Sequence, residues 1–98
     1  MISYIIAPDA SRDLEEISNY YAIHNIEAGE KLVSELENKC KYLVKFPNIG
    51  RSYQTIRPDL RGISCLGYII FYRVSKTSIE ILRVIYGSRD LEALFSEN

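Results

Sequence analysis

The sequence predicts an α+β domain in which a hairpin of two helices packs on a four-stranded antiparallel sheet, in the element order β-α-α-β-β-β. Three observations lead to this prediction. The stretch from Leu60 to Asp90 is crowded with β-branched and aromatic residues between short turns. Before it, two segments between residues 8 and 45 repeat apolar residues at helical spacing. The chain begins with a short apolar run, residues 2–7, that ends at a proline.

The N-terminal half predicts one strand and a helical hairpin. The run from Ile2 to Ala7 is short enough to favour a strand over a helix. Pro8 suits the first turn of a helix that should end near His24, and a second helix should run from Glu27 to Lys45. Because the link between the helices is so short, they should lie antiparallel and place their apolar stripes on the sheet. These stripes are Ala10, Leu14, Ile17 and Tyr21, then Ala28, Leu32, Leu36, Cys40 and Leu43.

The second half predicts a loop followed by three strands. Phe46 to Asp59 is too polar and too often broken by proline and glycine for a regular element, so its arginines should be free to reach a partner. We expect strands at Leu60 to Leu66, Tyr68 to Val74 and Ser78 to Tyr86, joined by turns that allow only antiparallel neighbours. The first strand should add beside the last, which gives the strand order 1-4-3-2. After Gly87, a short tail carries Leu91, Leu94 and Phe95.

Alternation along these strands predicts two apolar faces. One face carries Arg61, Ile63, Cys65, Ile69, Phe71, Arg73, Ile79, Ile81, Arg83 and Ile85, and the other carries Leu60, Leu66, Tyr68, Ile70, Tyr72, Val74, Leu82, Val84 and Tyr86. We expect the helices to cover the face of Leu82 and Val84. The opposite face would then be open to a partner, so the chain alone should be poorly soluble or self-associated.

Length and composition indicate a single domain, residues 1–98, of an ordinary soluble protein. The chain is 47% hydrophobic and 26% charged, which excludes disordered and collagen-like classes. Its apolar runs are too short to cross a bilayer and no basic segment precedes the first, so we expect a cytoplasmic protein with no membrane partner. Cys40, Cys65 and His24 have no other cysteine or histidine at the spacing typical of metal ligands, so we expect them to have structural roles. We expect the protein to bind no metal and no cofactor.

The charge is unevenly distributed along the chain. Residues 1–45 carry five basic and eight acidic residues, whereas residues 46–91 carry seven basic and three acidic residues. Because the planar guanidinium suits carboxylates, phosphates and base edges, the second half should meet an acidic protein or a nucleic acid. The alternative is that each arginine is solvated or paired within the chain. The arginines concerned are Arg51, Arg57, Arg61, Arg73, Arg83 and Arg89.

Motifs of the common enzyme classes are missing from the sequence. It has no glycine-rich phosphate loop, nucleophile elbow, HExxH pattern or paired-cysteine metal pattern. The arginines and Tyr86 could bind a scissile phosphate, but they supply no good general base at neutral pH and would make a weak ribonuclease. For Tyr86 we favour instead the role of an aromatic residue that closes the core at a strand end.

Several segments together carry a family resemblance: Tyr4 with Pro8-Asp9-Ala10, Asp13 to Ile17, Tyr20-Tyr21, Leu43 with Pro47, Gly50 and Arg51, Leu60-Arg61, Tyr68 to Val74, and Ile79 to Asp90 with its ending RVIYGSRD. In order and spacing they resemble the ParE/RelE superfamily of bacterial toxins, on its ParE side, over almost the whole chain. Tyr86 stands where many ParE-like sequences have histidine. The resemblance implies a β-α-α-β-β-β toxin encoded beside an antitoxin that wraps around its sheet and helical hairpin.

The resemblance also implies the partners. The antitoxin would be a ribbon-helix-helix or similar DNA-binding protein with an amphipathic tail, and the toxin would meet DNA only through it. ParE-like members imply poisoning of DNA gyrase without catalysis, whereas RelE-like members imply cleavage of mRNA on the ribosome. Since the lysine-rich stretch expected of ribosome-dependent members is absent, we favour gyrase. A messenger-RNA endonuclease and a decayed, non-toxic interaction module are the alternatives.

These implications assign roles to residues of the second half. We favour no catalytic residue; in a ribonuclease the catalytic residues would be Arg61, Arg73, Arg83 and Tyr86. The residues expected to bind the target or partner are Arg51, Arg61, Arg73, Arg83, Tyr86, Arg89, Leu91, Leu94 and Phe95.

Overall fold

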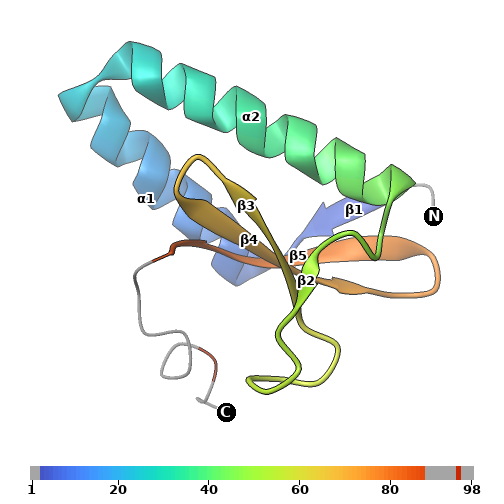
Figure 1. The fold of residues 1–98 in the computed structure, drawn as a ribbon. Coiled ribbons are helices and arrows are strands. Elements are labelled where there is room, and N and C mark those ends of the chain that lie inside the picture. Colours follow the sequence, from blue (N-terminus) through green and yellow to red (C-terminus); the bar gives the residue numbers. More distant parts are fainter. Residues whose placement is uncertain (1–2, 88–94, 96–98) are drawn as a thin grey trace.

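A helical hairpin lies across one face of a five-stranded sheet in the computed structural model, which describes residues 3–87 and Phe95 (Figure 1). The predicted α+β class is confirmed. The elements in chain order are β1 (Ser3–Ile6), α1 (Pro8–His24), α2 (Ile26–Lys45), β2 (Arg51–Ser52), β3 (Arg61–Cys65), β4 (Tyr68–Val74) and β5 (Ser78–Tyr86). The strand order is β1-β5-β4-β3-β2, so the first strand lies beside the last as expected.

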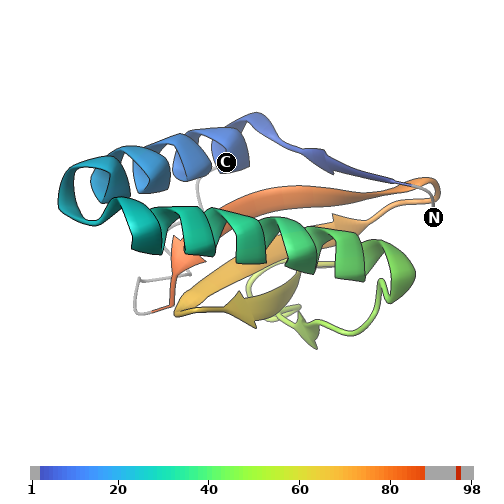
Figure 2. The ribbon, with the colours of Figure 1, turned by 90° about the horizontal axis from the view of Figure 1, so that it is seen from above.

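Two details of the sheet differ from the prediction. The segment between the second helix and the third strand is not wholly irregular, because Arg51 and Ser52 form the short edge strand β2 against β3. In addition, β1 pairs with β5 in parallel, so the sheet is mixed and not purely antiparallel. The parallel pairing arises because α1 continues onward from β1 and α2 runs back to the start of β1 (Figures 1 and 2).

The core between helices and sheet is built from the predicted stripes. Ala10 and Ile17 of α1 and the stripe of α2 from Leu32 onward are buried there, with Leu14 and Tyr21 partly buried beside them. From the sheet, this core receives Cys65, Ile70, Tyr72, Ile79, Ile81 and Val84. Both cysteines are free and buried, and burial is the main cause that raises the pKa of Cys40 to about 11. Its thiol is therefore neutral and packs as a small apolar group.

The assignment of strands to faces was wrong in two places, each for an identifiable reason. In the ladder between β4 and β5, Phe71 pairs with Arg83 but Tyr72 pairs with Ile81, so Leu82 is an extra residue in a β-bulge. The bulge inverts the alternation, and Ile79 and Ile81 therefore join the helix-side core while Leu82 packs on the opposite side.

The hairpin between β3 and β4 caused the second error. Cys65 pairs with Tyr68, which puts Ile63 and Cys65 on the face of Ile70 instead of the opposite face. The two turn residues, Leu66 and Gly67, both have positive φ, of 50° and 88° respectively. Such a two-residue connection fixes the register directly, because the residues that flank it must face each other.

The second face of the sheet is covered by the chain itself, which corrects the expectation of an open apolar surface. Leu60, Phe71 and Ile85 are buried there beneath partly buried residues of the 53–60 segment and Phe95. The segment comes close because Gly62 leaves room for it: a Cβ at Gly62 would lie 2.8 Å from the ring of Tyr53. The chain alone therefore does not expose the surface on which its predicted self-association rested.

Candidate binding surfaces

Four of the arginines predicted as site residues lie in the described part of the chain, and each contacts a different part of it. On β3, half-buried Arg61 donates hydrogen bonds from Nη1 to the carbonyl oxygens of Gly50, at 2.8 Å, and Asn48, at 3.2 Å. The buried hydroxyl of Tyr72 binds the same turn, since it donates to the carbonyl of Pro47 and accepts from the amide of Gly50. Arg61 and Tyr72 therefore hold the turn that leads into β2.

On β4, Arg73 faces Glu80 across the ladder with β5, and its Nε donates to Glu80 Oε1 at 2.7 Å. This pair is exposed, so it contributes little to stability. Arg51, on the edge strand β2, is exposed and lies with its guanidinium carbon 5.3 Å from the ring centroid of Tyr53. Arg51 and Arg73 thus lie on strands that are not adjacent in the sheet.

Arg83 is held most firmly, by Asp13 of α1. Pairing with β1 stops at Ile81, so the following residues of β5 form an open sheet edge along which α1 passes. There Asp13 accepts hydrogen bonds from Arg83 Nε at 2.8 Å, Arg83 Nη2 at 2.9 Å and the amide of Val84 at 2.9 Å. The Asp13 side chain takes the place of a strand partner directly after the bulge. Hydrogen bonding to Asp13 raises the pKa of Arg83 above its ordinary value, although burial opposes the rise.

Tyr86 closes the C-terminal end of β5 and is 53% exposed. Its ring meets the ring of Tyr68 edge-on, with 5.4 Å between centroids, and lies against Gly67 of the β3–β4 turn. Tyr86 therefore packs on aromatic and turn residues at the strand end while about half of its surface stays exposed.

These contacts decide what the predicted ribonuclease residues can do together. The guanidinium group of Arg61 donates to backbone carbonyls, that of Arg73 donates to Glu80, and that of Arg83 donates to Asp13. Of these four residues, Arg83 and Tyr86 line one pocket together. Arg61 and Arg73 do not line that pocket. Among the described residues, these three guanidinium groups therefore do not converge on one point.

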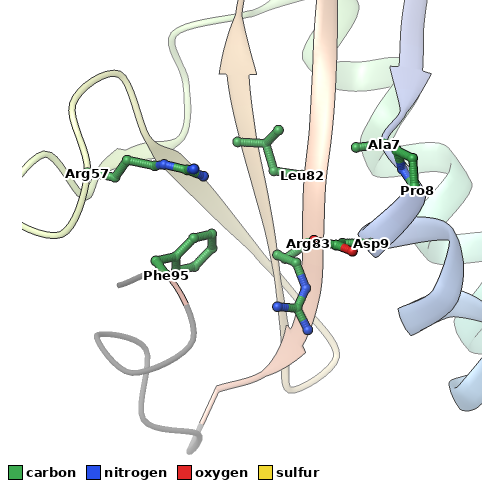
Figure 3. Close-up of a pocket in the computed structure, with 7 residues that line it drawn as sticks. All are labelled: Ala7, Pro8, Asp9, Arg57, Leu82, Arg83 and Phe95. Atoms are coloured by element: carbon green, nitrogen blue, oxygen red, sulfur yellow. The ribbon is translucent and has the colours of Figure 1, made fainter. Parts of the chain in front are cut away.

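A polar pocket of about 380 Å³ lies where β1 turns into α1, beside β5 (Figure 3). Its lining includes Arg83 and Leu82 of the bulge, Asp9 of α1, and Arg57 and Phe95 from the far side. The guanidinium carbon of Arg57 lies 5.7 Å from the ring centroid of Phe95, and that ring meets Phe71 edge-on. We call it the Arg57 pocket. It combines an aromatic side chain with arginine, the residue types enriched at the centres of protein interfaces.

An apolar groove follows the helical hairpin. Between the helices and the sheet, a pocket of about 220 Å³ is lined by Tyr4, Ile6, Leu14, Val33 and further core residues. Val33 also lines a second, mainly apolar pocket on the outer side between α1 and α2. Ile5, Ile6 and Val33 remain 51%, 42% and 43% exposed. This set of pockets, the hairpin groove, is wide enough to accept apolar side chains of a partner helix.

Sequence reasoning identified some of these residues and missed others. The structure brings Arg83 and Phe95 together in the Arg57 pocket, whereas Arg89, Leu91 and Leu94 lie outside the described residues. Asp13, Arg57 and Val33 were not selected as site residues. Val33 could have been found, because it stands on α2 beside the buried stripe and so borders its exposed flank.

Neither a membrane span nor a metal cluster is found in the part of the chain that the structure describes. None of the described helices is long and apolar enough to cross a bilayer. Within residues 3–87 and Phe95, no three histidine, cysteine, aspartate or glutamate side chains are grouped as metal ligands would be.

Comparison with known proteins points to one family. The family described as "ParE toxin of type II toxin-antitoxin system, parDE" matches residues 4–91. Toxin ParE1 of Mycobacterium tuberculosis is 31% identical over 91 residues, which span 91% of this chain and 93% of that protein. Toxin ParE3 of Caulobacter vibrioides is 27% identical over 84 residues, which span 85% of this chain and 84% of that protein.

A solved structure agrees with these sequences. The structure described as "Chromosomal ParDE TA system from P. aeruginosa" has a TM-score of 0.73 and 25% sequence identity to this chain, and the match covers 88% of this chain and 96% of that one. The similarity in sequence and in structure extends over most of the chain. The chain therefore belongs to the ParE toxin family of type II toxin-antitoxin systems.

Proposed function

We propose that this chain is a toxin that inhibits DNA gyrase by binding it, and that a cognate antitoxin neutralises it. Toxin action would then need no catalytic residue and no cofactor. The toxin would act in the cytoplasm and would meet DNA only through the antitoxin, a ribbon-helix-helix or similar DNA-binding protein with an amphipathic tail.

The observation that carries the proposal is the engagement of the arginines within the chain. A ribonuclease of this fold would need free cations on a scissile phosphate, yet Arg61, Arg73 and Arg83 bind carbonyl and carboxylate oxygens of the chain itself. Freeing Arg83 would leave Asp13 without its charge partner in a half-buried site, which is costly. Binding of a protein target makes no such demand.

The Arg57 pocket is the part of the surface that best suits a protein target. Arg57 is exposed and lies over an aromatic ring that is anchored in the second core cluster. An anchored ring and an arginine lose little conformational freedom on binding, which favours a tight interface. We propose that this pocket contacts gyrase, together with Arg89, Leu91 and Leu94 of the C-terminal sequence.

The hairpin groove suits the antitoxin. Its lining is mainly apolar and its rim carries Glu30 and Glu37, so an amphipathic helix could bury its apolar side there and place basic residues at the rim. The groove and the Arg57 pocket share none of their lining residues. An antitoxin that filled only the groove would therefore leave the Arg57 pocket open. To block that pocket as well, the antitoxin must extend beyond the groove, as a tail that wraps around the toxin would.

The variant Tyr86→Phe tests whether toxicity needs catalysis. A ribonuclease that used the Tyr86 hydroxyl should lose about 100-fold or more of its activity with this change. A gyrase-binding toxin should keep its toxicity within about twofold to threefold, because only one exposed hydroxyl is removed. Growth arrest after graded induction in a bacterial host measures the effect, with thermal unfolding of the purified variant as the control for folding.

The competing outcomes are distinct. Loss of growth arrest with Tyr86→Phe, together with loss of mRNA cleavage at the ribosome, would establish the ribonuclease and contradict the proposal. Absence of toxicity in the wild-type chain, with antitoxin binding preserved, would identify a decayed interaction module.

A further inference from the structure

A second pocket, which we call the tyrosine pocket, lies at the C-terminal end of β5 on the α1 side of the sheet edge. Its volume is about 200 Å³. Three tyrosine side chains line it, namely Tyr20 of α1, Tyr68 of β4 and Tyr86 of β5, and two carboxylates, Asp13 and Glu16, join them from α1. The remaining lining residues are Ile17, Arg83, Val84 and Ile85.

The tyrosines present neutral aromatic surfaces to this pocket. Tyr20 and Tyr86 are more than half exposed, whereas Tyr68 is half-buried and braces Tyr86 edge-on. Burial, followed by the neighbouring phenol of Tyr21, raises the pKa of Tyr68 to about 12, so this phenol stays uncharged near neutral pH. Tyr20 is itself held in place by the rings of Tyr21 and His24, at centroid distances of 5.1 Å and 4.3 Å. Rings fixed in this way attract cations to their faces.

The charges around the pocket favour the same sign of ligand. Arg83 is the one cation among the described residues that line the pocket, and Asp13 already accepts two hydrogen bonds from its guanidinium. Glu16 is exposed and makes no hydrogen bond or ion pair with any residue that the structure describes. Because the charges of Arg83 and Asp13 offset each other, the carboxylate of Glu16 gives the described lining residues a net negative charge. A phosphate would be repelled here, whereas a cation would find both a carboxylate and aromatic faces.

We propose that the tyrosine pocket binds a cationic side chain, an arginine or a lysine, that is presented by the protein target of the toxin. The inference rests on the proposed function, in which the toxin acts by binding a protein, and it adds the chemistry of one contact. Arg83 lines both the tyrosine pocket and the Arg57 pocket, so the two pockets are adjacent parts of one surface. The target should therefore present an acidic group to Arg57 and, beside it, a basic group to Glu16 and Tyr86.

The first test uses the purified full chain and small probes. N-acetyl-arginine amide is titrated into the isotope-labelled protein while the ring resonances of Tyr20 and Tyr86 and the side-chain resonances of Glu16 are followed by NMR. The probe should shift these resonances with weak, millimolar affinity. N-acetyl-norleucine amide, which has an uncharged side chain of similar length, and inorganic phosphate should shift them much less. Stronger binding of phosphate than of the arginine probe at these residues would overturn the proposal.

Matched variants locate the contact. Glu16→Gln should weaken binding of the arginine probe about threefold to fivefold, because the free carboxylate is lost while the helix is kept. Tyr86→Leu should weaken it similarly, whereas Tyr86→Phe should not. Glu15→Gln is the control, since Glu15 is an exposed neighbour on α1 that does not line the pocket. Equal effects of Glu15→Gln and Glu16→Gln would show a general charge effect and contradict a built site.

A second measurement separates this inference from the proposed function. Inhibition of purified gyrase by Glu16→Gln should need about threefold to fivefold more toxin than inhibition by the wild type. If the wild-type chain inhibits gyrase and Glu16→Gln does so equally well, the cation contact is wrong and the proposed function stands. If Glu16→Gln weakens the antitoxin complex and leaves gyrase inhibition unchanged, the assignment of the pocket to the target is overturned.

Discussion

Replacing Asp13 with alanine should lower the free energy of unfolding by about 2 to 4 kcal/mol. One carboxylate holds the guanidinium of Arg83 and the amide of Val84, and both side chains of the ion pair are largely shielded, with 20% and 12% exposed. The variant leaves a half-buried cation without its partner and an edge amide without its acceptor. For a domain of this size, such a loss is a large share of the total stability of about 5 to 15 kcal/mol.

Asp9→Ala is the matched control for Asp13→Ala. Asp9 lies on the same helix and pairs with Arg12, but the side chains of that pair are 67% and 64% exposed, so its removal should cost less than about 1 kcal/mol. Equilibrium denaturation of both variants measures the difference, and Asp13→Asn should fall between them because it keeps an acceptor for Val84. A cost below about 1 kcal/mol for Asp13→Ala would mean that the Asp13 contacts do not hold the bulged edge of β5.

The variant Val33→Glu should weaken the complex with the cognate antitoxin by about 100-fold or more. Val33 borders both parts of the hairpin groove, and a partner helix that buries it would have to desolvate the new carboxylate beside Glu37. The free toxin should fold normally, since Val33 is 43% exposed and glutamate is a good helix former. Titration calorimetry with the purified antitoxin gives the affinity of each variant.

The control for Val33→Glu is Asn38→Glu, which adds the same charge to α2 at an exposed position outside the groove. Its affinity for the antitoxin should stay within about threefold of wild type. If both variants bind as tightly as wild type, the antitoxin does not occupy the hairpin groove.

Much of the fold could be predicted because apolar residues recur at the spacing that buries one face of each helix and strand. The stripes of α1 and α2 and the three strands of the second half follow from the spacing of apolar residues. The pairing of the first strand with the last follows from the way the elements are connected along the chain. The faces of the strands could not be predicted by counting alone, since the extra residue Leu82 inverts the alternation within β5. No local residue pattern marks Leu82 as the bulged position. In the folded chain Asp13 of α1 binds the strand edge two residues after Leu82, a contact that the local sequence does not reveal.

The candidate surfaces were less predictable than the fold. Cover for the second face depends on a long loop and on Phe95, which are brought together only by the tertiary structure. The pairing of Arg83 with Asp13 joins residues 70 positions apart in sequence, so the sequence showed an arginine but not that it is engaged. Tertiary contacts of this kind cannot be seen in the sequence. For that reason Arg57 could not be predicted as a site residue, although it lines the same pocket as the two predicted site residues Arg83 and Phe95.

If the toxin acts by binding gyrase and not by cutting RNA, as we propose, purified gyrase alone should respond to it. The most direct test is a supercoiling assay with purified gyrase, relaxed plasmid and purified toxin, in the absence of ribosomes. We expect supercoiling to be inhibited in proportion to the toxin concentration and to be restored by addition of the antitoxin. Undiminished supercoiling at a large excess of folded toxin, with mRNA cleaved when ribosomes are supplied, would contradict the proposal.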